Sequence, residues 1–101
     1  MKVYLIRNGE GYYKVEYTKH DVSYRMSQLQ TGSSSELEYI NECEVLHPTK
    51  VESALHRQYK QYHIILEWFN LPDDVVENFV ESAKRIDGTF QLLIDAGNPF
   101  I

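Results

Sequence analysis

Two short runs of β-branched and aromatic residues close to the N-terminus constrain the fold most strongly. Residues 3–6 and 13–17 are rich in Val, Ile, Leu and Tyr, and the loop between them contains two glycines. Strand-forming segments on either side of a glycine-containing loop are typical of a β-hairpin. If the turn centres on residues 9–12, opposite residue numbers sum to about 21. Tyr4 would then lie opposite Tyr17, on one face of the sheet.

One further strand and three helices are predicted downstream. Residues 21–30 have helical spacing of apolar side chains, with an aspartate able to cap the start and a glycine after the end. Residues 37–45 alternate as a half-buried strand does. Residues 49–62 begin with the spacing of a capping box and carry an apolar helical face. Residues 72–83 begin with proline and two aspartates, which favour a helix start.

The C-terminal segment gives little periodic signal. Residues 86–101 contain a short apolar run from Phe90 to Ile94, which is compatible with a strand, a docking tail or a loosely ordered segment. We therefore place the domain at residues 1–85. Residues 86–101 are interpreted as a C-terminal extension that packs on the same domain.

Length and cysteine content favour one domain in a reducing compartment. A chain of 101 residues with 43% hydrophobic content can bury a core without metals or disulfides. The single cysteine, Cys43, cannot form an internal disulfide. No stretch approaches the roughly 20 apolar residues that a membrane helix needs, and the N-terminus does not resemble a signal peptide. We expect a cytoplasmic protein with no membrane contact.

The net charge of −5 argues at first against nucleic acid as a partner. Its distribution weakens that argument. Residues 1–63 contain eight basic and eight acidic residues, whereas residues 64–101 contain two basic and seven acidic residues. A locally basic face is therefore compatible with the first two thirds of the chain.

Several segments, in order and at compatible spacing, resemble the GIY-YIG nuclease family, in its small phage and fungal subfamily. The resemblance extends over roughly residues 2–82, and five segments in order make coincidence improbable. The segments are Val3-Tyr4-Leu5-Ile6, Tyr12 to Thr18, Arg25 with Gln28 to Gly32, Glu52 to His56, and Glu67-Trp68-Phe69.

The resemblance implies a fold and an activity. The family fold is a three-stranded antiparallel sheet flanked by helices, in the order β-β-α-β-α-α, which agrees with the α+β pattern predicted above. The family activity is hydrolysis of DNA phosphodiester bonds with Mg²⁺ (or Mn²⁺). The phage-type subfamily implies a bacterial or phage-infected cell.

The resemblance also assigns four catalytic residues. Tyr4 and Tyr17 match the two motif tyrosines, Arg25 the helix arginine, and Glu52 the metal-binding glutamate. A tyrosine can deprotonate water only if neighbouring charge lowers its pKa from about 10, to which Arg25 and a metal ion would both contribute. Arg25 would also stabilise charge on the phosphoryl oxygens, and Tyr17 would position the water or the phosphate. Further candidate substrate contacts are Lys14, Lys19 and His56.

Four positions depart from the family pattern, which are Lys2, Glu16, Leu29 and Leu66. Glu16 stands where the second motif ends in glycine, and in the predicted register it lies beside Leu5, on the face opposite the tyrosines. A buried carboxylate there would be costly unless it reached solvent or a cation such as Lys14 or Lys19. Leu66, before the Glu-Trp-Phe segment, also stands where glycine is common.

Each site residue has an ordinary alternative role. Tyr4 and Tyr17 could form a cross-strand aromatic pair, and Arg25 could be a solvated helix residue. Glu52 could complete the capping box that begins at Thr49. The remaining alternatives are a surface or half-buried pair of His56 with Glu52, and a core position for Trp68.

Two functions of different classes follow. The first is an active endonuclease domain that uses a single divalent metal ion. The second is a catalytically weakened scaffold that binds nucleic acid or inhibits a protein partner, which Glu16 and the acidic balance favour. The retained set of four catalytic residues favours the first.

Overall fold

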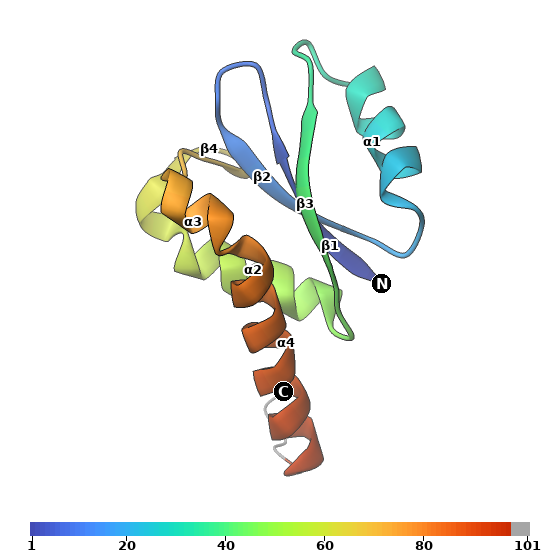
Figure 1. The fold of residues 1–101 in the computed structure, drawn as a ribbon, viewed down its shortest axis with the longest axis vertical. Coiled ribbons are helices and arrows are strands. Elements are labelled where there is room, and N and C mark those ends of the chain that lie inside the picture. Colours follow the sequence, from blue (N-terminus) through green and yellow to red (C-terminus); the bar gives the residue numbers. More distant parts are fainter. Residues whose placement is uncertain (98–101) are drawn as a thin grey trace.

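A five-stranded antiparallel sheet forms the centre of the structure (Figure 1). The computed structural model describes residues 1–97. The strands lie in the order β3-β1-β2-β5-β4. The predicted α+β class and its three central strands are confirmed, and two short strands extend the sheet. In chain order the elements are β1 (Lys2–Arg7), β2 (Tyr13–Thr18), α1 (Val22–Thr31), β3 (Glu38–Glu44), α2 (Pro48–Gln58), the 3-10 helix η1 (Lys60–Tyr62), β4 (His63–Ile65), β5 (Trp68–Phe69), α3 (Asp73–Glu77) and α4 (Phe79–Asp95).

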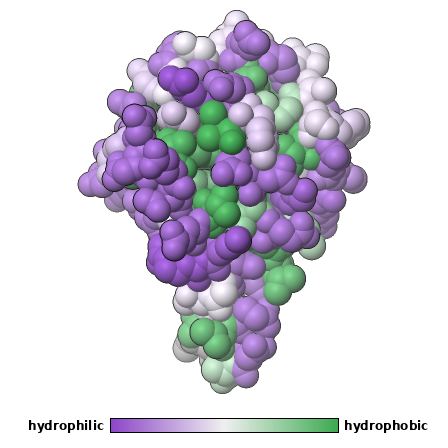
Figure 2. Space-filling model, in the orientation of Figure 1, coloured by the Kyte–Doolittle hydropathy of each residue, from purple (hydrophilic) through white to green (hydrophobic). Residues whose placement is uncertain are grey.

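The C-terminal helix is longer than the sequence pattern indicated. The chain from Asp73 forms two helices, α3 and α4, and α4 continues through Asp95. The readings of residues 86–95 as a strand or a loosely ordered tail are therefore wrong. Ile86 is buried in the core and Leu92 is exposed. The last turns of α4 project beyond the sheet (Figure 1), and hydrophobic residues lie on the surface of this projecting part (Figure 2). Residues 98–101 lie outside the described residues.

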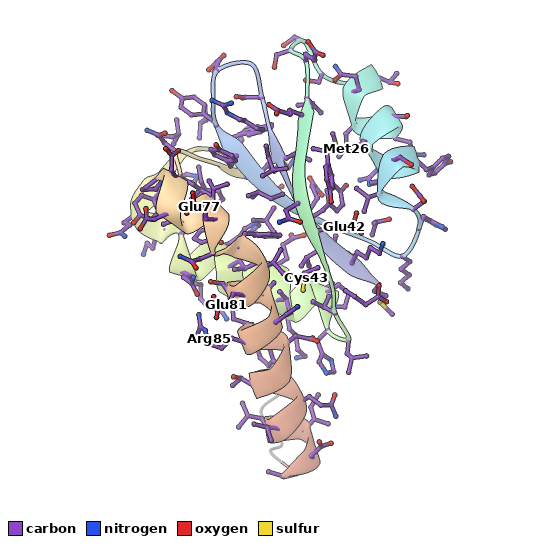
Figure 3. All side chains as sticks on the ribbon, in the orientation of Figure 1. Met26, Glu42, Cys43, Glu77, Glu81 and Arg85 are labelled. Atoms are coloured by element: carbon purple, nitrogen blue, oxygen red, sulfur yellow. The ribbon has the colours of Figure 1, made fainter. Side chains whose placement is uncertain are left out.

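The acidic C-terminal third is largely a solvated helical surface. Glu77, Glu81 and Arg85 point away from the sheet on α3 and α4 (Figure 3). Carboxylates near the start of α3, Asp73 and Asp74, also favour the positive end of its dipole. No helix in the described range of 1–97 is long and apolar enough to cross a membrane.

The register of the first hairpin differs by one residue from the predicted one. Tyr4 lies opposite Glu16, and Val3 lies opposite Tyr17. The cause is a five-residue loop: the Asn8 side chain accepts hydrogen bonds from the backbone N–H groups of Glu10 and Tyr12, at 3.0 and 2.9 Å. A shift of one residue moves side chains to the other face of the sheet. The expectation that the two tyrosines share a face is therefore wrong.

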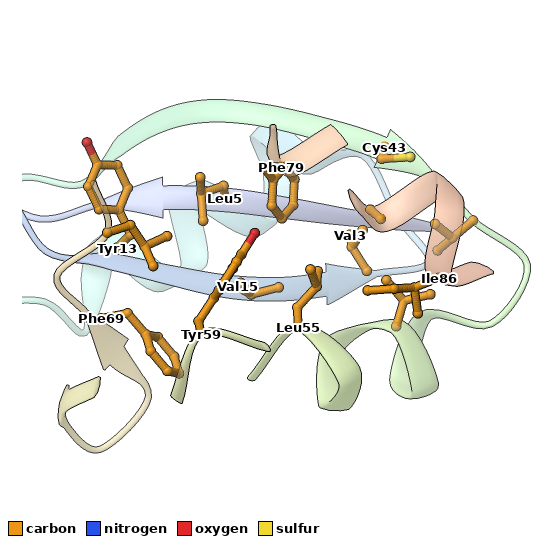
Figure 4. Packing of buried hydrophobic residues seen from close by; sticks show 14 residues of the cluster. Val3, Leu5, Tyr13, Val15, Cys43, Leu55, Tyr59, Phe69, Phe79 and Ile86 are labelled. Atoms are coloured by element: carbon orange, nitrogen blue, oxygen red, sulfur yellow. The ribbon is translucent and has the colours of Figure 1, made fainter. Parts of the chain in front are cut away.

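The two faces of the sheet bury two separate sets of side chains. On one face α2 and α4 cover the larger core, and on the other α1 covers Tyr4 and Ile6 (Figures 1 and 4). Tyr4 has no exposed surface. The members of the larger core include Val3, Leu5, Val15, Leu55, Tyr59, Phe79, Ala83 and Ile86.

Helix α2 begins without the predicted capping box. His47 is the N-cap residue and Pro48 is the first helical residue. The carboxylate of Asp87, on α4, accepts hydrogen bonds from the backbone N–H groups of Leu46 (3.0 Å) and His47 (2.9 Å). The start of α2 is therefore held by a distant residue. Glu52, a full turn further on, is free of a capping role.

The turn between β4 and β5 is strained. Leu66 has a φ of 52°, in the left-handed region that favours glycine. The Nε2–H of His63 donates a hydrogen bond of 2.6 Å to the Leu66 carbonyl oxygen, which holds the turn closed. Ile65 and Trp68 pair on either side of it. A glycine at this position would release the strain.

We expect Leu66→Gly to raise the free energy of unfolding by up to about 1 kcal/mol, because glycine adopts positive φ without a steric cost. The matched control is Leu92→Gly, at another exposed leucine inside α4, which should lower it by about 1 kcal/mol. Urea denaturation measures both. A Leu66→Gly protein destabilised as much as Leu92→Gly would contradict the backbone assignment.

Candidate functional site

Side chains from four elements converge beside Tyr4. Glu16 comes from β2, Arg25 from α1 and Glu52 from α2, and the charges of all three act on the Tyr4 phenol. Because Tyr4 lies in β1, the central strand of the β3-β1-β2 array, the site sits on a rigid part of the sheet. The structure thus brings together three of the four residues that were predicted as catalytic.

Tyr17 is not among them. It lies opposite Val3, on the face covered by α2 and α4, and 38% of its surface is exposed. Lys14, predicted only as a substrate contact, takes a place in the site, because alternation along β2 puts Lys14 and Glu16 on the Tyr4 face. The signal in the sequence is Asn8, whose side chain shapes the loop and so sets the pair Arg7 and Tyr13.

Lys14 lies between two carboxylates. Its Nζ is 2.9 Å from Oε1 of Glu16 and 3.5 Å from Oε2 of Glu67. Burial lowers the pKa of Lys14, but the hydrogen bond and charge of Glu16, with Glu67, outweigh it, so the pKa is raised overall. Glu16 was expected to need a cation, and Lys14 was one of the two expected partners. The ion pair forms, although on the opposite face from the one predicted.

The Tyr4 hydroxyl is buried and unsatisfied. Within residues 1–97 no group meets hydrogen-bond geometry with it. Burial, with the charge of Glu16, raises the pKa of Tyr4 to about 12, and the nearby Arg25 guanidinium only partly opposes this. Arg25 lowers the pKa of Tyr4, as expected, but burial and the charge of Glu16 outweigh it in the protein alone. Tyr4 keeps its proton at neutral pH, so it can donate a hydrogen bond to a ligand.

Glu52 is a half-buried carboxylate whose ionised form a nearby cation would stabilise. Burial raises its pKa to about 7, the charges of Glu16 and Glu67 act in the same direction, and Lys14 partly offsets them. Each group makes ionisation of the others more costly unless positive charge is present. Glu52 is therefore poised between its protonated and ionised forms near neutral pH.

These groups fit one hard cation held by a single carboxylate. Nowhere in the part of the chain that the structure describes do three or more His, Cys, Asp or Glu side chains form a metal-binding group. Mg²⁺ does not need such a group, because it keeps several waters and takes ligands from one or two carboxylates and from substrate oxygens. The raised pKa of Glu52 and the unsatisfied Tyr4 hydroxyl both favour a charged ligand at this place.

The remaining predicted contacts lie at the edge of the site. His56 is on α2, one turn after Glu52, and its ring centroid is 5.5 Å from that of Phe69. Its Nε2 atom is buried and has no partner in the described chain. Lys19 is exposed in the turn after β2. The missed contact is Glu67, which reaches Lys14 from the β4–β5 turn.

Comparison with known proteins gives one match. The protein-family model of the T5orf172 domain matches residues 1–84. No curated protein and no solved structure matches the chain. The matched range contains every residue of the site described above.

We expect the side-chain carboxyl of Glu52 to titrate near pH 7, which NMR detection of glutamate carboxyl carbons can follow. Glu16→Gln should lower the midpoint, because it removes the neighbouring charge that raises the pKa of Glu52. Glu36→Gln, at an exposed position remote from this cluster, should leave it unchanged. A wild-type midpoint near the ordinary 4.5 would contradict the clustering of these carboxylates.

The same shift predicts a pH dependence of stability. Because the folded-state pKa lies above 4.5, ionised Glu52 is less favourable in the folded than in the unfolded state. The stability associated with protonated Glu52 is complete below about pH 4.5 and is lost as pH rises through 7. Glu52→Gln should therefore be the more stable protein at pH 8, by on the order of 1 kcal/mol after solvent screening. Urea denaturation of both proteins at pH 5 and pH 8 measures the difference in their free energies of unfolding. A difference that is the same at both pH values would contradict the prediction.

Proposed function

The chain belongs to the T5orf172 domain family, a GIY-YIG-like family of phage open reading frames, and on that premise we propose that it is an endonuclease domain. The family indicates a nuclease-like or DNA-binding domain. The proposed reaction is hydrolysis of DNA phosphodiester bonds with a single divalent metal ion, Mg²⁺ or Mn²⁺.

One observation carries this proposal. Tyr4, Arg25 and Glu52 come from three different elements and act on one another in a single partly buried site, together with Lys14 and Glu16. A set of surface residues without a shared function has no reason to converge in this way, and burial of coupled charges is unfavourable for stability. Such convergence is typical of a catalytic or binding site.

Each side chain has a chemical role in the proposed reaction. Arg25 offers a planar fork that matches two phosphoryl oxygens and stabilises the charge that develops on them. Tyr4, protonated at neutral pH, donates a hydrogen bond to a phosphate oxygen or to the attacking water. Lys14 holds the phosphate as a point charge. Glu52 would hold the metal ion, which when bound neutralises phosphate charge and makes a bound water more acidic.

Glu16 favours a second candidate function. Its carboxylate lies directly opposite Tyr4 and holds the ammonium group of Lys14. Negative charge at this place repels phosphate oxygens, and it occupies a cation that would otherwise meet them. The second candidate is therefore a catalytically weakened domain that binds nucleic acid or a protein partner. In the first candidate, substrate or metal binding separates Lys14 from Glu16.

Cleavage of supercoiled and branched DNA near neutral pH, with Mg²⁺ or Mn²⁺, tests the two candidates. We expect the wild-type protein to cut, and Glu52→Gln and Arg25→Ala each to lower the rate by about 100-fold or more. Tyr4→Phe, which loses one hydrogen bond, should lower it by roughly 10-fold.

Matched controls separate the site from general effects of substitution. Tyr17→Phe should stay within about two-fold of wild type, because Tyr17 is not among the groups that act on Tyr4 or Glu52. Equal losses for Tyr17→Phe and Tyr4→Phe would contradict the proposed site. If wild type is inert while Glu16→Gly or Glu16→Gln cuts, the second candidate function holds.

A further inference from the structure

The β4–β5 turn exposes an apolar tip beside the candidate site. Ile64, Ile65 and Leu66 are consecutive, and they are 46%, 59% and 80% exposed. Single exposed aliphatic residues are common, but three in succession at the end of a hairpin form a localised apolar projection. These three side chains do not pack in the core, so core packing does not explain why they are apolar.

The backbone holds this tip in place at a cost. Leu66 has positive φ, and the His63 side chain fixes its carbonyl oxygen. Glycine would serve the turn better, as it does at the first central position of many two-residue hairpins. A bulky aliphatic residue in a strained and exposed position points to a role for the side chain itself.

The tip is tied to the phosphate-facing side of the site. Glu67, the next residue, pairs with Lys14, and the Lys14 ammonium also lies 5.8 Å from the centroid of the Trp68 ring. Ile65 is the cross-strand partner of Trp68, so the two side chains share a face of the hairpin. Lys14 on β2, Trp68 on β5 and Ile65 on β4 therefore neighbour one another in turn, and Leu66 follows Ile65 in the turn.

A pocket adjoins Lys14 and Trp68. Its lining also includes the apolar side chain of Leu29 and the polar groups of Gln28 and Ser33. Apolar and aromatic surfaces beside amide and hydroxyl groups match the faces and edges of a nucleobase. The Lys14 ammonium matches the adjoining phosphate.

We propose that Leu66, supported by Ile65, is a wedge that enters between two stacked bases next to the scissile phosphate. Apolar side chains that insert in this way unstack a base step and bend the duplex. The preferred substrate is then DNA in which that step is unpaired or readily unstacked, such as a mismatch, bubble or branch. This inference rests on the proposed function.

A protein partner fits this tip less well. A stable protein interface needs roughly 800 Å² from each partner, more than three aliphatic side chains expose. A base step requires only one or two such side chains. The Trp68 ring beside the tip, with the Lys14 ammonium 5.8 Å from its centroid, also favours a base as the occupant.

The test compares a fully paired DNA duplex with the same duplex that carries a three-nucleotide bubble at the cut. We expect Leu66→Gly and Leu66→Asn, both compatible with positive φ, to cut the paired duplex about 10-fold more slowly. They should cut the bubble within about two-fold of wild type, because its bases are already unstacked. Leu66→Met should keep wild-type rates on both, and Leu92→Ala controls for loss of an exposed leucine elsewhere.

A second readout does not need cleavage. With EDTA present, 2-aminopurine placed beside the cut should brighten when wild-type protein binds, and should not brighten with Leu66→Gly. If Leu66→Gly and Leu66→Asn both cut the paired duplex at the wild-type rate and both increase 2-aminopurine fluorescence, the wedge proposal is wrong, whereas the nuclease proposal still stands. A wild-type protein that neither binds nor cuts either DNA would overturn the proposed function and the wedge together. A change of oligomeric state in the Leu66 variants, with DNA cleavage unaffected, would identify a protein contact instead.

Discussion

The pairing of Tyr4 with Glu16 across the first hairpin is the constraint on which the rest of the structure depends. Side chains alternate along a strand, so this one register sends Val3 and Val15 into the core under α2 and α4. The same register sends Tyr4, Lys14 and Glu16 to the α1 face. A shift of one residue would remove Lys14 and Glu16 from the site.

Buried polar and ionisable groups in the site lower the stability of the folded state, and the hydrophobic core must compensate for this. A buried phenol without a hydrogen-bond partner in the described chain and a carboxylate with a pKa of about 7 both make the folded state less stable than apolar side chains would. Proteins retain such groups where binding or catalysis needs them. A bound ligand would remove this destabilisation. A metal ion would bind at Glu52, and a phosphate group would bind at Arg25 and Lys14.

The local signals in the sequence predict most of the elements, and the errors arise from long-range interactions. Periodicity finds the first three strands and the helices α1 and α2. It misses the start of α2, because Asp87, some forty residues away, replaces the local cap. It also misses the register, because the Asn8 side chain shapes the five-residue loop. Of the site, Tyr4, Arg25 and Glu52 were predictable from the family resemblance. Glu67 belongs to a matched segment, but its contact with Lys14 was not predictable, since only the sheet brings the two together.

The central claim is that Glu52, Glu16 and Tyr4 form one cation-responsive site, and Mn²⁺ titration followed by NMR tests it. Paramagnetic broadening should begin at Glu52 and reach Tyr4 and Glu16 before any other part of the chain, and Glu52→Gln should abolish it. The acidic side chains of α3, including Asp73, should broaden only at higher Mn²⁺ concentration. Broadening that begins on α3, or that persists in Glu52→Gln, would contradict the account.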